Sequence, residues 1–158
     1  MKRTKKEWLN YIAAFFDGEG NVTIKILKNG KARKYYKFSP EIFITQKTEN
    51  VLIQIKKILK FGKIYKRLRC ERFDYGIRSH ADILEFIKLI KPYSIVKTIQ
   101  LSLIKKLIFY KETRKIRNNP YTKEELKIML KIRDDLHKLN GGKLKYTSKQ
   151  ILRKLNCK

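Results

Sequence analysis

The sequence is poor in acidic residues, histidine and cysteine, and it contains no long apolar run. Its two cysteines, Cys70 and Cys157, lie far apart, so we expect neither a disulfide framework nor a zinc site. His80 and His137 are too few and too scattered for a histidine-based metal cluster. The apolar stretches fall far short of the roughly 20 residues that span a bilayer, and the basic N-terminus lacks the apolar core of a signal peptide. These absences favour a reducing intracellular compartment and predict no membrane partner.

The shortage of acids leaves a strongly basic chain. The 158 residues include 40 Lys and Arg against 14 Asp and Glu, which gives a net charge of +26. Nucleic acid is the leading partner, because neutralising its phosphates releases counterions. The alternative is a lysine-biased proteome with solvated lysine faces. The Lys and Ile bias also fits an AT-rich genome, so we expect a prokaryotic cytoplasm or an organelle, either mitochondrion or chloroplast.

An amphipathic helix is predicted near the N-terminus. Apolar residues recur there with helical spacing at Trp8, Tyr11, Ile12, Phe15 and Phe16. A second stripe is small, with Asn10, Ala14 and Gly18 spaced four residues apart. Small residues at this spacing let another backbone approach closely. The alternative is that the stripe packs on the protein's own sheet.

The period then changes to two, which indicates strands over residues 21–26 and 36–46. Apolar and polar side chains alternate in both segments, with Phe43 as the exception. Pro40 predicts a bulge or an edge position in the second segment. The basic connection between the two segments contains an Asn-Gly turn.

A helix and a second pair of strands follow. Thr48 is a plausible N-cap for a helix over 51–59, which Gly62 ends. Alternation then predicts strands over 63–70 and 72–78. The first of these two strands directs inward the side chains of Ile64, Leu68 and Cys70.

The remainder of the chain is predicted to be helical. Ser79 can cap a helix that stops at Pro92, and a long apolar and basic helix is predicted over 95–113. Capping boxes, which are Thr122 with Glu125 and Thr147 with Gln150, start helices over 123–139 and 148–156.

Strand pairs that alternate with helices predict an α+β fold. We expect one twisted antiparallel sheet with helices on one face and the other face open. The chain is expected to form a single domain over 1–158, with a core of 1–117 and C-terminal helices in 118–158.

The open face of this predicted sheet carries basic and polar side chains. A twisted ribbon or small sheet can enter the DNA major groove, where Arg pairs with guanine and Asp accepts from cytosine. The alternative is an ordinary solvated sheet face. The expected DNA contacts are Thr23, Lys25, Lys37, Ser39, Arg67, Arg69, Arg72, Asp74 and Arg78.

Two acids, Asp17 and Glu19, stand where a helix C-terminus prefers cations. One interpretation is a helix stop, with Gly18 or Gly20 in the left-handed conformation and the acids as turn formers. The other is a divalent cation bound by a carboxylate and an exposed backbone carbonyl, since Mg²⁺ accepts one or two carboxylates with phosphate oxygens and water.

The segment IAAFFDGEG, residues 12–20, resembles the motif of the LAGLIDADG homing endonucleases. Ala14 stands in place of the motif's central glycine, and Glu19 in place of its usual final Asp. The resemblance covers most of residues 5–113 and implies the αββαββα fold of that family.

The same resemblance extends to two further segments. TQKT and KPYSIVKTIQ resemble segments that supply a catalytic glutamine and a catalytic lysine in the family, here Gln46 and Lys97. The loop NGGKLKYT resembles one that contacts DNA phosphates. We therefore also expect DNA contacts from Lys143 and Lys145 of this loop, and one from Asn29 of the basic turn between the first two strands.

The chain has one copy of the motif, and single-motif members of the family are homodimers. The resemblance implies that the motif helices of two subunits pack through Asn10, Ala14 and Gly18 on a long pseudo-palindromic double-stranded DNA target. Glu19 and the Gly18 carbonyl would hold Mg²⁺ or Mn²⁺, while Ca²⁺ could bind without supporting cleavage. The implied reaction is hydrolysis of both strands, leaving 3′ overhangs, by an intron-encoded enzyme.

Three other functions stay open. The first is an RNA maturase of the same fold that assists intron splicing, and the second is a non-catalytic DNA-binding regulator. The third is a basic ribosome-associated protein. Family maturases often lose the acids, so the retained Glu19 favours cleavage over the first. The presence of both Gln46 and Lys97 counts against the second, and the third leaves Asp17 and Glu19 unexplained.

Overall fold

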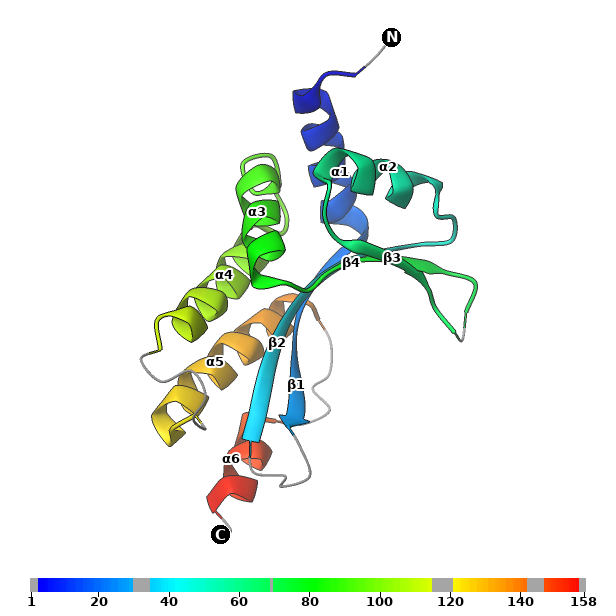
Figure 1. The fold of residues 1–158 in the computed structure, drawn as a ribbon. Coiled ribbons are helices and arrows are strands. Elements are labelled where there is room, and N and C mark those ends of the chain that lie inside the picture. The colour runs from blue at the N-terminus through cyan, green and yellow to red at the C-terminus, as the bar shows by residue number, and fades with distance from the viewer. Residues whose placement is uncertain (1–2, 30–34, 69, 115–120, 142–146, 157–158) are drawn as a thin grey trace.

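The structure is a computed structural model that describes residues 3–29, 35–68, 70–114, 121–141 and 147–156. Its elements follow the predicted order of helices and strand pairs (Figure 1). They are α1 (Lys5–Glu19), β1 (Gly20–Asn29), β2 (Tyr35–Gln46), α2 (Asn50–Leu59), β3 (Lys63–Lys66), β4 (Phe73–Ile77), α3 (His80–Ile90), α4 (Thr98–Glu112), α5 (Lys123–Leu139) and α6 (Ser148–Asn156).

The four strands form one antiparallel sheet in the order β1-β2-β4-β3. In Figure 1, α4 and α5 lie along the β1–β2 pair, while α2 lies over β3 and β4. Gly20 pairs with Ile44 of β2, and Ile42 of β2 pairs with Ile77 of β4. The motif helix therefore ends beside the part of β2 that also pairs with β4. The predicted α+β architecture is confirmed.

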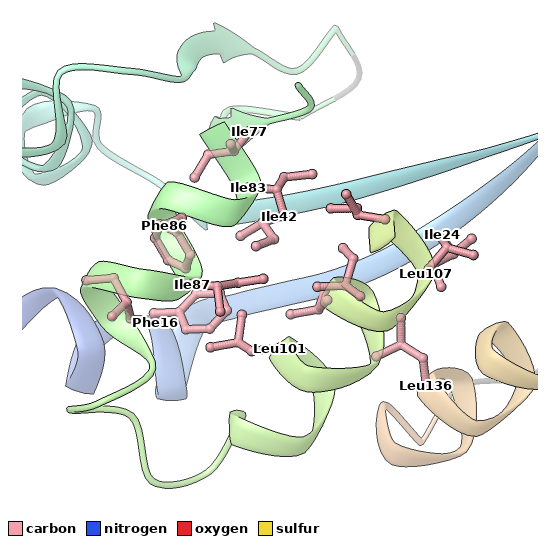
Figure 2. Close-up of a cluster of buried hydrophobic side chains, with 14 of the residues drawn as sticks. Phe16, Ile24, Ile42, Ile77, Ile83, Phe86, Ile87, Leu101, Leu107 and Leu136 are labelled. Atoms are coloured by element: carbon pink, nitrogen blue, oxygen red, sulfur yellow. The ribbon is translucent and has the colours of Figure 1, made fainter. Parts of the chain in front are cut away.

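Helices cover a single face of this sheet, and the large apolar side chains of the strands point toward that face. The side chains on the covered face belong to all three longer strands and are almost fully buried. They are Val22, Ile24, Phe38, Ile42, Ile44, Tyr75 and Ile77. Figure 2 shows Ile24 and Ile42 in one apolar cluster with residues of the covering helices, which are Phe16 of α1, Phe86 and Ile87 of α3, Leu101 and Leu107 of α4, and Leu136 of α5.

The C-terminal helices share this core. Met129, Leu130 and Leu136 of α5 are buried, and Asn140, the C-cap of α5, donates from Nδ2 to the Val22 carbonyl at 2.8 Å. The capping box at Thr122 forms as predicted. Within the described ranges, no helix is both long and apolar enough to cross a membrane.

Three predicted boundaries are wrong. Glu49, not Thr48, is the N-cap of α2, and its side chain makes no capping hydrogen bond. Lys60 takes the left-handed C-cap position with φ 66°, before Gly62 does so at φ 78°. The helix expected from residue 95 begins at Thr98, because the preceding residues bind a carboxylate of α1.

The predicted third strand is also shorter than expected. β3 ends at Lys66, and Leu68 and Cys70 are exposed instead of facing inward. The chain turns here, since the Arg67 N–H donates to the Arg72 carbonyl at 2.9 Å. An alternating pattern in sequence cannot distinguish such a turn from a longer strand.

Pro40 lies in a continuous register with Ile24, without the bulge that the sequence suggested. β4 pairs with β2 only from Ile42 onward, so the missing N–H of Pro40 leaves no ladder bond unmade on that side. β2 is an inner strand of the sheet, but at Pro40 it is paired on one side only, with β1.

Candidate active site and nucleic-acid interface

The motif helix α1 is fixed at both ends. Thr4 and Glu7 form a capping box at its start, and Leu9, Ile12 and Phe16 bury its apolar face. At its end Gly20 is the C-cap, and its N–H donates to the Phe16 carbonyl. No basic residue lies in the last turn, so the helix carries its two acids into the negative end of its dipole.

Gly20 is required by packing, not by backbone conformation. Its φ of −78° is one that any residue adopts, and neither Gly18 nor Gly20 is left-handed, so that expectation was wrong. A Cβ at Gly20 would lie 2.1 Å from Cδ2 of Phe16. The ring cannot yield, because Phe16 is fully buried and packs edge-on against Phe86 with centroids 5.0 Å apart.

Substitution Gly20→Ala should therefore destabilise the fold by about 1–3 kcal/mol, as overpacking typically does. Urea denaturation of dilute protein measures this difference. Gly18→Ala is the matched control, because a Cβ there would point into open space, with no described residue beyond its own helix within 4 Å. Equal stability of the two variants would contradict the packing role of Gly20.

The Asp17 carboxylate binds the segment that leads into α4. Its Oδ1 accepts from the Ser94 hydroxyl at 2.6 Å and from the Lys97 N–H at 3.2 Å. Its Oδ2 accepts from the N–H groups of Ile95 at 2.6 Å and Val96 at 3.1 Å. Burial alone would raise the pKa of Asp17, but these four hydrogen bonds together lower it below its usual value. Asp17 is thus an acid fully engaged by its own chain.

The side chain of Lys97 in turn binds the backbone of Asp17. Its Nζ donates to the Asp17 carbonyl at 2.5 Å and lies 6.0 Å from the centre of the Phe16 ring. The cation that a helix C-terminus prefers is therefore supplied from 80 residues downstream. The structure brings the predicted catalytic lysine to the end of the motif helix.

Gln46 is the last residue of β2, where it pairs with Phe73. Gly20, the first residue of β1, pairs with Ile44. Gln46 therefore lies two residues beyond the strand position that receives the end of α1, and it is half-buried. The three predicted catalytic residues share one end of the sheet, although no hydrogen bond among the described residues joins Gln46 to Glu19.

The open face of the sheet carries two clusters of paired charges. In the first, Glu41 is only 8% exposed, with Oε2 2.5 Å from Lys25 Nζ and Oε1 3.4 Å from Arg78 Nε. The Arg78 guanidinium also lies 5.0 Å from the centre of the Tyr65 ring. Two of the predicted DNA contacts are therefore held by a buried acid.

In the second cluster, Arg67 Nε donates to Asp74 Oδ2 at 2.7 Å, and Arg67 Nη2 donates to Thr45 Oγ1 at 3.0 Å. Thr45 in turn donates to Asp74 Oδ1 at 2.5 Å. The hydrogen bond that Arg67 donates to Asp74 raises the pKa of Arg67 above its usual value. Asp74 is predicted to accept a hydrogen bond from a cytosine. In the structure, it accepts hydrogen bonds from Arg67 and Thr45 of its own chain.

The other predicted DNA contacts vary in setting. Lys37 and Arg72 are exposed, while Thr23 and Ser39 are half-buried on the open face between charged neighbours. Asn29 ends β1. Outside the described residues lie Arg69, Lys143 and Lys145.

Comparison with known proteins adds the family. A model described as LAGLIDADG endonuclease matches residues 12–116. The chain belongs to this family. The DNA endonuclease I-CreI of Chlamydomonas reinhardtii is 26% identical over 151 residues, which cover 94% of this chain and 88% of that protein.

Solved structures of LAGLIDADG endonucleases show the same fold. The archaeal intron-encoded homing endonuclease I-Vdi141I, complexed with DNA, has a TM-score of 0.82 at 20% identity and 98% coverage of both chains. The homing endonuclease I-CvuI, in complex with its target, has a TM-score of 0.77 at 18% identity and 96% coverage of both. The predicted family, fold and activity as a site-specific DNA endonuclease are confirmed at the level of the family.

The small stripe of the LAGLIDADG helix faces outward. Asn10, Ala14 and Gly18 are exposed, and open space surrounds Gly18. The alternative that this stripe packs on the protein's own sheet is therefore wrong, since Ile12 and Phe16 on the opposite side fill that role. The stripe is available to a second helix.

Glu19 and the Gly18 carbonyl fit a metal bound between molecules better than one bound within this chain. Glu19 is exposed at the end of α1 and makes no hydrogen bond or ion pair with the residues described. Among those residues, no group of three or more His, Cys, Asp or Glu could enclose an ion. One carboxylate from each chain suits Mg²⁺, which fills its remaining positions with water and phosphate oxygens.

Sequence reasoning missed three residues of the open face. Lys63, which pairs with Gly76, is exposed on that face. It precedes Tyr65 by two residues in the same strand, so the alternating pattern could have placed its side chain on the open face. Tyr65 stands over Gly76, where a Cβ would come 1.9 Å from the Tyr65 hydroxyl. For Glu41 the sequence indicates only that it lies on the polar side of its strand, and nothing in the sequence predicts that it is buried between two cations.

Proposed function

We propose that two copies of this chain bind a long pseudo-palindromic double-stranded DNA target and hydrolyse both strands with a divalent metal. The division of labour between the two motif acids carries this proposal. Asp17 is consumed by four hydrogen bonds inside the chain, whereas Glu19, two residues later, is exposed and unpaired among the described residues. Only Glu19 is left to act on something outside the chain.

The surface beside Glu19 supports pairing with a second copy. The stripe of Asn10, Ala14 and Gly18 is exposed on the same helix. Next to its end, Ile95 is 86% and Val96 64% exposed, although their backbone is held firmly by Asp17. Rigid apolar side chains left in water next to a small-residue stripe favour burial against a partner. A two-fold axis there would bring the two Glu19 side chains together.

Two carboxylates brought close repel each other and favour a cation between them. Glu19 of each subunit, with the Gly18 carbonyl, would hold Mg²⁺ or Mn²⁺. Such an ion, when bound, activates water and stabilises the leaving oxygen of a phosphodiester. I-CvuI has been crystallised with DNA in the presence of Mg²⁺ and of Ca²⁺, which supports a divalent metal here.

The chain's own residues would position the reactants. Gln46 would orient water from the end of β2. Lys97, whose ammonium group already neutralises the helix end, would stabilise negative charge that develops on the phosphate. The charged sheet face would dock the DNA. The net charge of +26 also predicts that DNA binding weakens steeply as the salt concentration rises.

Incubation with genomic or randomised duplex DNA and Mg²⁺, followed by mapping of both ends of each break, tests this function. We expect paired breaks with 3′-hydroxyl overhangs at a recurring near-palindromic site, and none when the metal is chelated. Specific binding without any cut would favour the non-catalytic regulator. A preference for structured intron RNA over the duplex would favour the maturase.

The pairing of motif helices gives a separate prediction. Ala14→Glu places a carboxylate in the small stripe and should shift the protein from dimer to monomer, as measured by analytical ultracentrifugation. The physical reason is that two buried like charges would face each other across the axis. Ala81→Glu is the matched control, because Ala81 is exposed in the first turn of α3, where an acid is favourable. A dimer that survives Ala14→Glu would contradict this interface.

A further inference from the structure

A buried acid lies at the centre of the basic open face. Glu41 is 8% exposed, while the side chains of its partners Lys25 and Arg78 are 51% and 57% exposed. Glu41 pairs with Thr23 across β1, and it precedes Ile42, which pairs with Ile77 of β4. It therefore lies where three strands meet, beneath two cations that reach into solvent.

The Arg78 guanidinium is held on two sides. Its Nε faces Glu41 Oε1 at 3.4 Å, and its central carbon lies 5.0 Å from the centre of the Tyr65 ring. The ring is itself fixed, since Tyr65 packs over Gly76 where no side chain could fit. An ion pair and a cation–π contact together restrict a side chain that would otherwise be long and mobile.

The pairing leaves one edge of the guanidinium available. The Nε faces Glu41 as an ion pair, and among the described residues none accepts a hydrogen bond from Nη1 or Nη2 of Arg78. Arg67 differs, because Asp74 takes its Nε and Thr45 takes its Nη2. Among the described arginines of this face, Arg78 offers a pair of terminal donors from a position anchored by an ion pair and a ring contact.

We infer that Glu41 is a specificity-determining residue that positions Arg78 to read a guanine in the major groove. The two Nη groups of Arg78 match the O6 and N7 acceptors of guanine. A phosphate is the poorer partner, since its charge would approach the carboxylate beneath and draw Arg78 away from a buried acid. This role rests on the proposed docking of double-stranded DNA on the open face.

Selection of binding sites from randomised duplexes, with Ca²⁺ present so that bound DNA stays intact, tests the inference on the full chain. We expect wild type to prefer guanine at one position of each half-site. Arg78→Ala should reduce that preference about tenfold and leave the other positions unchanged. Glu41→Gln should also reduce it severalfold, while binding to unrelated DNA is unchanged or tighter because one negative charge is gone.

The double variant Glu41→Gln/Arg78→Ala distinguishes positioning from direct contact. If Glu41 acts through Arg78, the double variant should show the same base preferences as Arg78→Ala alone. Loss of a further preference would mean that Glu41 itself reads a base, and would overturn the positioning role. Lys37→Ala is the control for phosphate contacts, since it removes an exposed cation of the same face and should weaken all sequences alike.

Other results would overturn the inference without affecting the proposed function. If wild type selects a site whose base preferences survive both Glu41→Gln and Arg78→Ala, Glu41 has only a structural role. If Glu41→Gln lowers the melting temperature but leaves the base preferences unchanged, Glu41 likewise has only a structural role. Failure of wild type to select any sequence would instead contradict the proposed function itself.

Discussion

Glu19→Gln should bind its target site as tightly as wild type in Ca²⁺ and fail to cut it in Mg²⁺. The amide keeps the shape of the side chain but loses the charge that a divalent cation requires of its ligands. Glu19 is exposed and makes no hydrogen bond or ion pair with the described residues, so the change should leave the free energy of unfolding within about 0.5 kcal/mol. The cleavage rate should fall by roughly 10³-fold or more, the scale seen when a central catalytic group is removed.

A plasmid carrying the selected site measures this rate, and a gel-shift assay measures binding. Glu124→Gln is the matched control, because Glu124 is also exposed, in the first turn of α5, at the other end of the molecule from the motif. The control should cut at the wild-type rate. Cutting by Glu19→Gln at a rate close to that of wild type would remove Glu19 from the mechanism.

Local signals in the sequence predicted most of the elements. The helical spacing of α1, the capping residue Ser79, and the capping box of Thr122 with Glu125 all depend on neighbours within one or two turns. The alternation of β1 and β2 likewise predicted which side chains are buried. These features follow from sequence because the interactions that produce them are close in the chain.

The features that sequence could not predict join distant residues. The sequence does not show which groups bind the Asp17 carboxylate, because its partners, Ser94 and the next three residues, lie far along the chain. The start of α4 was misplaced for the same reason, since the chain before Thr98 is shaped by a carboxylate on another helix. No local periodicity carries that information.

The charged face shows a similar division. Parity predicted that Lys25, Arg67, Asp74 and Arg78 share one side of the sheet, and the structure confirms it. Their pairing depends on strand register and on the sheet order, in which β4 lies between β2 and β3. A list of exposed cations therefore overstates how many are available for phosphates, since Glu41 and Asp74 already restrain three of them.

Asp17→Asn should lower both stability and catalysis without abolishing DNA binding. An Asn side chain keeps one acceptor and turns an NH₂ group toward backbone N–H donors, so at least one of the four hydrogen bonds is replaced by a clash of donors. We expect a loss of about 2 kcal/mol in the free energy of unfolding, in the range of hydrogen bonds to charged groups. Displacement of Lys97 should slow cleavage by roughly 10- to 100-fold, as loss of supporting contacts at a metal site does.

The pH dependence of this loss follows from the lowered pKa of Asp17. A carboxyl whose pKa is lower in the folded state stabilises the fold fully above its ordinary pKa of about 4. That stabilisation is lost as the pH falls through the lowered pKa. The difference in unfolding free energy between wild type and Asp17→Asn should therefore be constant near neutral pH and shrink in acid below about pH 4.

Ser94→Ala grades the same contact, because it removes only the hydroxyl donor at 2.6 Å and leaves the three backbone donors in place. Its cost should be about 1 kcal/mol, with a smaller effect on cleavage than that of Asp17→Asn. If Asp17 acts by positioning Lys97, the variant that loses more stability should also lose more of its cleavage rate, so Asp17→Asn should be the more affected in both measurements. An Asp17→Asn variant that is as stable as wild type yet cannot cut would instead show that Asp17 binds the metal directly, beside Glu19.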